Sequence, residues 1–271
     1  MSRPREEQGR GKRHPGRQTP QAQQPKRGPR LRASPRREAR RPPRPELPED
    51  RPRLSDDVYR DLRATTRPNE LGDVTRAFAA AGKAFEAGDI DRATELLTWA
   101  KHAATRSAVI REALGVAHYL AGDLASANRE LLAYRRLSGR QDQNHLLADC
   151  ARAAGRSEKV AEYVDDMVRA SVPPDRVAEG LLVLAGECAD RGDLRGSLNT
   201  LERAGLDPSR IQPWHPRLWY FAGDLYERLG DLERARGYFE AVAAVEEDFF
   251  DVEDRLAALA RHDEHGNGSP E

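Results

Sequence analysis

A histidine, an aspartate and a cysteine stand close together near the middle of the chain, at His145, Asp149 and Cys150. His145 and Asp149 are four residues apart, so both lie on one face of a helix. Imidazole, carboxylate and thiolate are side chains that bind transition metals. The cluster lacks further ligands, however, and a lone histidine–aspartate pair is more often a surface hydrogen bond. We therefore predict no metal here, and we predict that Cys150 and Cys188 are reduced, buried side chains.

No other group of residues has the spacing of a catalytic or cofactor site. His102, His118 and His215 are scattered along the chain, and there is no nucleophile elbow, H-E-x-x-H or dinucleotide fingerprint. The "GRGK" at 9–12 lacks the full phosphate-loop pattern, and no strand precedes it. We predict that the protein is not an enzyme and that it carries no cofactor.

The charge of the chain is divided unevenly along its length. The 271 residues hold 45 basic and 45 acidic side chains, but residues 1–53 contain 17 basic and 6 acidic ones, which leaves 28 and 39 in the remainder. A basic arm joined to an acidic body is typical of an interaction tail. No apolar run approaches the ~20 residues of a membrane helix, and no apolar stretch follows the basic N-terminus. We expect a soluble cytoplasmic protein.

The basic segment 1–53 also contains 11 of the 18 prolines and almost no aliphatic side chains. Such a segment buries too little apolar surface to offset its loss of entropy on ordering, so we predict a disordered tail. One interpretation is nucleic-acid contact through phosphate-binding arginines, and the other is a solvated arm with no dedicated ligand. The arginines in question are Arg27, Arg30, Arg32, Arg36, Arg37, Arg40, Arg41 and Arg44.

The remainder of the chain contains an internal repeat, marked by a glycine that recurs at spacings of 34, 33, 37 and 38 residues. Each of these glycines follows a helical run, where a left-handed residue suits glycine. An aspartate comes next in four cases and is predicted to cap the following helix, and Ser157 is predicted to do so in the third. The glycines are Gly88, Gly122, Gly155, Gly192 and Gly230.

These repeats resemble the tetratricopeptide repeat, a 34-residue pair of antiparallel helices with the pattern W-x2-L-G-x2-Y…A-x3-F. The last repeat matches best, with Trp219, Gly223 and Tyr226 followed by Ala235 and Phe239. Over about residues 45–250 the chain also resembles uncharacterised actinobacterial tetratricopeptide proteins with a basic Pro/Arg-rich N-terminal arm. That likeness rests on "YRRLSGRQDQ" at 134–143 and implies no activity.

The predicted fold is all-α: a right-handed α-solenoid of about five tetratricopeptide-like hairpins with a C-terminal capping helix and a disordered N-terminal tail. The predicted boundaries are 1–53 for the tail, 54–73 for a leading helix and linker, and 74–247 for the repeats (74–107, 108–140, 141–177, 178–215 and 216–247). The capping helix is expected at 248–262 and a disordered tail at 263–271.

The resemblance implies that the first helix of each repeat lines a peptide-binding groove. The residues that it assigns there are Glu112, Val116, Tyr119, Asp142, His145, Asp149, Arg152, Tyr220, Asp224 and Glu227. This set is acidic in character and suits a basic peptide, an amphipathic helix or the chain's own tail. We predict an interaction scaffold that binds a protein partner. The alternative is an RNA- or ribosome-associated factor that contacts nucleic acid through the arginine-rich tail.

Overall fold

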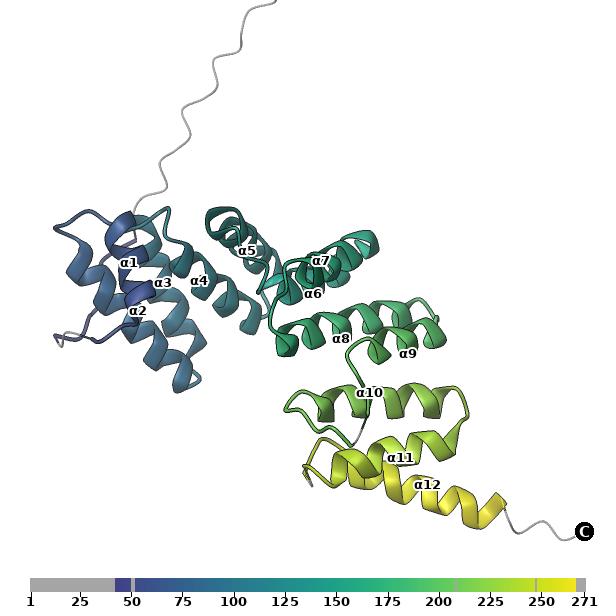
Figure 1. The fold of residues 1–271 in the computed structure, drawn as a ribbon. Coiled ribbons are helices and arrows are strands. Elements are labelled where there is room, and N and C mark those ends of the chain that lie inside the picture. The colour runs from purple at the N-terminus through teal and green to yellow at the C-terminus, as the bar shows by residue number, and fades with distance from the viewer. Residues whose placement is uncertain (1–41, 50–51, 208, 247, 267–271) are drawn as a thin grey trace, which may run out of the picture. The chain divides into compact units, whose positions relative to one another are not determined.

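The structure, a computed structural model, describes residues 42–49, 52–207, 209–246 and 248–266. Within these ranges the regular elements are twelve α-helices and no strand, which confirms the predicted all-α fold (Figure 1). The helices are α1 (Asp56–Thr65), α2 (Leu71–Glu86), α3 (Ile90–Ala103), α4 (Ala108–Leu120), α5 (Leu124–Ser138), α6 (Asn144–Ala153), α7 (Ser157–Arg169), α8 (Pro174–Asp190), α9 (Leu194–Glu202), α10 (His215–Arg228), α11 (Leu232–Ala243) and α12 (Val252–Gly266).

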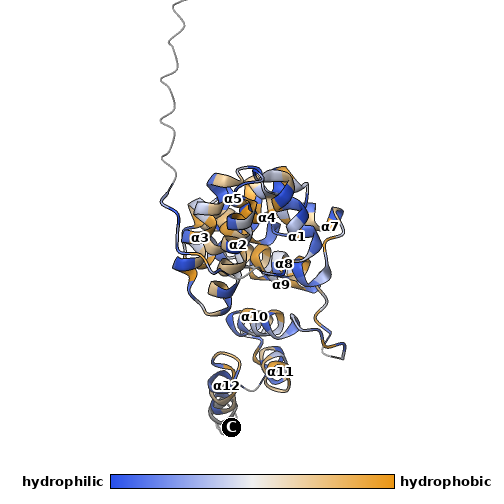
Figure 2. Cartoon of the chain, turned by 90° about the vertical axis from the view of Figure 1, so that its left-hand side faces the viewer, coloured by the Kyte–Doolittle hydropathy of each residue, from blue (hydrophilic) through white to orange (hydrophobic). Residues whose placement is uncertain are grey.

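The ten helices from α2 to α11 form five consecutive hairpins, each made of a first helix and a second helix (Figure 1). Figure 2 shows hydrophobic and hydrophilic residues mixed along the helices, as expected where each helix buries one face. The first helix of hairpin four begins at Pro174, earlier than the predicted boundary at 178. Proline lacks an N–H and has a helical φ, so it suits the first turn of a helix.

A glycine separates the two helices of each hairpin, and in four of the five an aspartate follows it, as predicted. All five repeat glycines have a positive φ, between 66° at Gly155 and 82° at Gly192. In four hairpins the following aspartate accepts a hydrogen bond from a backbone N–H in the first turn, as Asp89 does from Arg92 at 2.9 Å. The prediction for Ser157 is wrong: it is the first residue of α7, and its hydroxyl donates to Glu187 on α8 instead.

A small residue on the first helix faces a large residue on the second, sixteen positions later. At Gly223 an added Cβ would lie 2.7 Å from Cε1 of Phe239, and at Gly115 it would lie 2.7 Å from Cδ2 of Leu131. The same spacing pairs Ala81 with Leu97, Ala148 with Val164 and Ala185 with Leu201, and all ten residues are buried. The small residue therefore lets the paired helices approach closely, and the large one fills the space beside it.

Ion pairs whose carboxylates are buried or half-buried join successive hairpins. Glu130 on α5 is 5% exposed and receives Lys101 of α3 at 3.0 Å and Arg111 of α4 at 2.5 Å. Arg135 on α5 pairs with Asp166 on α7 in the next hairpin. In each case a cation neutralises a carboxylate that would otherwise be costly to bury, so these contacts favour one arrangement of the neighbouring hairpins.

Part of the predicted tail packs against the first hairpin. Pro45 is buried, Leu47 packs against the core of α2 and α3, and Arg92 donates to the carbonyl oxygen of Glu46 at 2.6 Å. Arg44 pairs with Asp73 of α2 at 2.9 Å. Residues 42–49 thus differ from the disordered tail predicted for 1–53, because Pro45 and Leu47 find apolar partners. The predicted nucleic-acid residues Arg27, Arg30, Arg32, Arg36, Arg37, Arg40 and Arg41 lie outside the described residues.

Replacing Gly223 by alanine tests the close approach of the helices. We expect Gly223→Ala to lower the free energy of unfolding by about 1–3 kcal/mol, because the Phe239 ring is fully buried and has no room to move. Gly82→Ala is the matched control on a first helix, since a Cβ there meets nothing within 4 Å. It should raise the same free energy by about 0.5–1 kcal/mol. Urea unfolding followed by circular dichroism measures both, and equal effects of the two substitutions would contradict the close contact.

Candidate functional site

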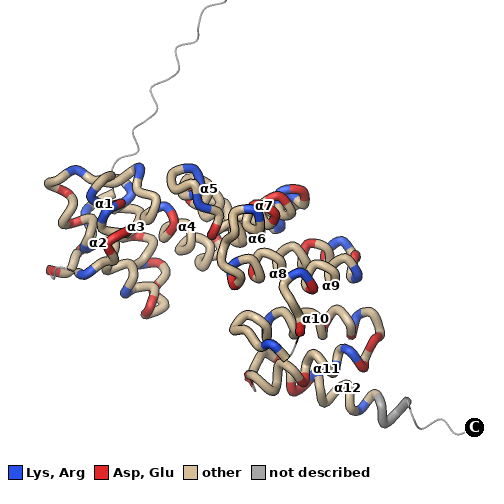
Figure 3. Tube along the Cα trace, in the orientation of Figure 1, with Lys and Arg blue, Asp and Glu red and all other residues tan. Residues whose placement is uncertain are grey.

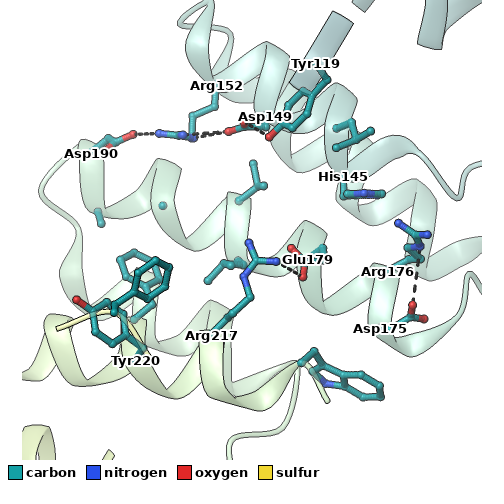
Figure 4. Close-up of a pocket in the computed structure, with 18 of the residues that line it drawn as sticks. Tyr119, His145, Asp149, Arg152, Asp175, Arg176, Glu179, Asp190, Arg217 and Tyr220 are labelled. Carbon is teal, nitrogen blue, oxygen red and sulfur yellow. Dashed lines mark hydrogen bonds and ion pairs between the residues drawn. The ribbon is translucent and has the colours of Figure 1, made fainter. Parts of the chain in front are cut away.

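A hollow of about 920 Å³ runs along four first helices, α4, α6, α8 and α10, and is called the main groove below. Five residues that the sequence assigned to a groove line it: Tyr119, His145, Asp149, Arg152 and Tyr220. They come from three hairpins, and Figure 4 shows their side chains around one common space. The main groove is therefore built by the stacking of hairpins and not by any single one.

One edge of the main groove is a chain of polar contacts. The Tyr119 hydroxyl donates to Oδ2 of Asp149 at 2.7 Å, and burial, reinforced by this bond, raises the pKa of Tyr119 above its usual range. Arg152 joins the same carboxylate at 2.9 Å to Asp190 of α8 at 2.8 Å (Figure 4). These bonds span α4, α6 and α8, so they hold four side chains of the groove in one geometry.

Charges of opposite sign are balanced in the main groove. Four acidic and four basic side chains line it, and Arg217 of α10 donates to Glu179 of α8 at 2.6 Å (Figure 4). Figure 3 shows acidic and basic residues interspersed along these helices. The expected acidic character of the groove does not hold for this hollow, because its lining includes two arginines that were not assigned to the groove, Arg176 and Arg228.

His145 and Cys150 are held in neutral forms. His145 is 7% exposed, and its Nδ1 donates to the carbonyl oxygen of Asp142 at 3.1 Å. Burial lowers the pKa of His145 to about 4, so Nε2 is an acceptor at pH 7. Burial also raises the pKa of the Cys150 thiol to about 11. Among the described residues no group of three histidine, cysteine, aspartate or glutamate side chains is placed to hold a metal ion.

Aromatic side chains gather at the end of the main groove near α10. Trp214, Tyr220, Phe221 and Phe250 line it, and the Tyr220 and Phe250 ring centroids are 5.3 Å apart. Phe250 is 77% exposed and has a φ of +47°, a strained conformation for a bulky residue. It was predicted inside the capping helix at 248–262, but α12 begins only at Val252, so Phe250 projects from the preceding turn.

Three predicted groove residues are engaged elsewhere. Asp224 and Glu227 on α10 both receive Arg255 of the capping helix, at 3.3 Å and 2.5 Å. Asp142 accepts the Tyr134 hydroxyl at 2.7 Å and pairs with Arg140. The capping helix thus neutralises Asp224 and Glu227 through Arg255. Asp142 lies in the connection between hairpins two and three.

The two remaining predicted residues, Glu112 and Val116, line a second hollow of about 270 Å³, called the N-terminal pocket below. Its other lining residues are apolar and come from α1, α2 and α4: Val58, Phe78, Phe85, Val109 and Ala113. Burial raises the pKa of Glu112, although a hydrogen bond from Nε2 of Gln143 at 2.7 Å opposes the rise. The pocket therefore combines one carboxylate with an apolar wall.

The sequence prediction missed all of the α8 contribution to the main groove. Those residues are Asp175, Arg176, Glu179, Leu182, Val183, Gly186, Ala189 and Asp190. A usable signal exists, because Gly192 marks the end of this hairpin's first helix, and counting back from it places the groove face on α8. The double proline and the degenerate motif of this repeat obscured that register.

Comparison with solved structures shows the fold. The chain matches a chain of the APC/C hetero-tetramer Cut9–Hcn1 with a TM-score of 0.58 and 16% identity, over 76% of this chain and 40% of that one. It matches TTC0263, a thermophilic TPR protein of Thermus thermophilus, with a TM-score of 0.53 and 15% identity, over 69% and 99%. It also aligns with YrrB, a TPR protein with an unusual peptide-binding site, with a TM-score of 0.48 and 14% identity, over 78% and 100%.

The fold is accordingly an α-solenoid of tetratricopeptide-like hairpins, as the repeat pattern predicted. No family model and no curated protein matches the sequence. Within the described ranges, none of the helices combines the length and the apolar character that crossing a bilayer requires.

Replacing Glu112 by glutamine tests the burial of its carboxylate. Because the pKa is raised in the folded state, the group favours folding below its ordinary pKa of 4.5 and opposes it once the pH exceeds the raised value. Glu112→Gln keeps an acceptor for Gln143, so we expect a higher melting temperature at pH 7 and no gain at pH 4. Glu95→Gln removes an exposed carboxylate paired with Arg92 and is the control. A gain that is equal at both pH values would contradict the assignment.

Proposed function

We propose that the protein is a non-enzymatic interaction scaffold whose main groove binds a peptide or helical segment of a partner protein. The observation that carries this proposal is the main groove itself, about 920 Å³ in volume and lined by four successive first helices. A hollow of this size and length suits a chain segment better than a single side chain.

The lining of the main groove indicates the chemistry of its ligand. Leu146, Leu182 and Val183 supply apolar surface between the charged pairs, and Phe250 stands exposed at one end. Aromatic side chains, phenylalanine among them, are enriched at protein interfaces. An amphipathic segment, with apolar residues against the floor and polar ones toward the edges, fits this arrangement.

The polar edges of the groove are ordered before any ligand arrives. Asp149, Arg152 and Asp190 are already joined, as are Glu179 and Arg217. Binding then orders few additional side chains, which lowers its entropic cost. The carboxylates and arginines of these edges are engaged with one another, and the lowered pKa of His145, about 4, makes its imidazole a weak base. This supports a binding role over catalysis.

The alternative, nucleic-acid contact through the arginine-rich tail, stays a prediction. Of its eight arginines, Arg44 lies in the described part of the chain, and it pairs with Asp73. The balanced charge of the main groove offers no surplus of cations for phosphates. The described residues therefore favour a protein ligand.

A plug placed in the groove tests the proposal. Gly186 lies on α8 in the groove wall, and the nearest atom to an added Cβ is Cδ of Arg152 at 4.0 Å, so Gly186→Trp fills the groove without disturbing the core. Gly237→Trp is the matched control, because Gly237 is exposed on α11 and a Cβ there meets nothing within 4 Å. We expect both variants to keep the helical hairpins intact, and far-ultraviolet circular dichroism checks this.

The ligand source is a phage-displayed library of random 16-residue peptides selected on the wild-type protein, with affinities then measured by fluorescence anisotropy. We expect Gly186→Trp to weaken the selected peptides by at least about tenfold, equivalent to about 1.4 kcal/mol, and Gly237→Trp to leave them within about twofold. If no sequence is enriched, or if both variants bind equally, the main groove is not a peptide site.

A further inference from the structure

The N-terminal pocket has an unusual composition for a hollow on this protein. Six of its seven lining residues are apolar, and the seventh is Glu112. The pocket lies beside the main groove along α4, since Glu112 and Val116 line the former and Tyr119 the latter. A polypeptide bound along the first helices therefore has a path from one hollow to the other.

Glu112 differs from three carboxylates on other first helices in what it contacts. Asp149, Glu179 and Glu227 each pair with an arginine. Glu112 instead accepts from the neutral amide of Gln143, and within the described part of the chain no ion pair joins it to a basic side chain. The Oε1 atom of the same Gln143 is buried and has no hydrogen-bond partner. The polar contacts in this corner are incomplete.

The surroundings of Glu112 favour a cation over an anion or a neutral group. Its burial disfavours the charged carboxylate, and nearby Asp142 adds to that effect. Arg140 and Arg176 stabilise the charge of Glu112 only weakly, without an ion pair to it, and Arg140 is already paired with Asp142. A cation brought next to Glu112 would offset the energy lost by burying its charge. The apolar wall, which includes Phe78 and Phe85, matches an aliphatic chain attached to that cation.

We propose that the N-terminal pocket is a recognition site for a lysine or arginine side chain of the bound partner. The aliphatic stem lies against the apolar residues of α1, α2 and α4, and the charged end pairs with Glu112. This inference rests on the proposed function, because it assumes that the partner segment runs along the first helices. It adds a specificity element: a basic residue placed at one end of an amphipathic segment.

Hexylammonium, a mimic of the lysine side chain, and hexanol, its neutral counterpart, are the probes. The full chain carries ¹³C-methyl labels on valine and alanine, so Val58, Val109, Ala113 and Val116 report from the pocket wall and Val183 reports from the main groove. We expect hexylammonium to shift the four pocket methyls and to bind there at least about fivefold more tightly than hexanol. The preference should fall as the salt concentration rises.

Glu112→Gln should abolish the preference for hexylammonium while leaving the affinity for hexanol unchanged. Glu95→Gln, which removes an exposed carboxylate on α3, should retain it. Loss of folding does not explain this result, because Glu112→Gln is expected to stabilise the protein at pH 7. The proposal is overturned if hexanol binds as well as hexylammonium, if neither shifts the pocket methyls, or if Glu112→Gln keeps the preference. Such a failure leaves the plug experiment at Gly186 unaffected, so the two proposals are tested separately.

Discussion

The contact between a small residue on the first helix and a large residue on the second sets the geometry on which the rest of the array depends. Gly223 against Phe239 and Gly115 against Leu131 allow no additional methyl group, so the distance between the paired helices is narrowly defined. Because interiors are close-packed, this spacing determines where each first helix lies relative to the next hairpin. The main groove consists of four such first helices, and its width therefore follows from contacts on their opposite faces.

A second constraint is that charges on the first helices are neutralised locally. Asp149 receives Arg152 from its own helix, Glu179 receives Arg217 from the next hairpin, and Glu227 receives Arg255 from the capping helix. Each pair keeps a half-buried charge from being isolated, which would be strongly unfavourable. The consequence for binding is that the groove presents apolar surface and aromatic rings between fixed polar edges. If the groove binds a chain segment as proposed, shape and apolar contact contribute more to its affinity than net charge does.

The fold could be predicted because its turns and helix caps depend on residues that are close together in the sequence. Glycine with a positive φ and the aspartate after it act within a few residues, so their spacing was enough to predict the hairpins. The groove residues were harder to predict. The repeat register indicates which face of a helix a residue lies on, but it does not indicate which side chain contacts that residue. Asp224 lies on the predicted face of α10, yet Arg255 from α12 contacts it. Phe250 was expected inside a helix that begins two residues later. Such contacts depend on packing between distant segments, which periodicity does not encode.

The two ends of the array differ in a way that bears on recognition. At the C-terminal end, Arg255 inserts between the acidic residues of α10 and stacks on Tyr220, at 5.8 Å from its ring centroid, so the chain satisfies this end itself. At the N-terminal end, the residue that α1 contributes to the pocket is Val58, which is apolar and leaves Glu112 with an amide in place of a cation. Arg255 of α12 supplies a positive charge to the acidic residues of α10. Glu112, at the other end, has no such cation among the described residues. Together the two proposals imply a direction for a partner bound along the first helices, with its basic residue toward α1.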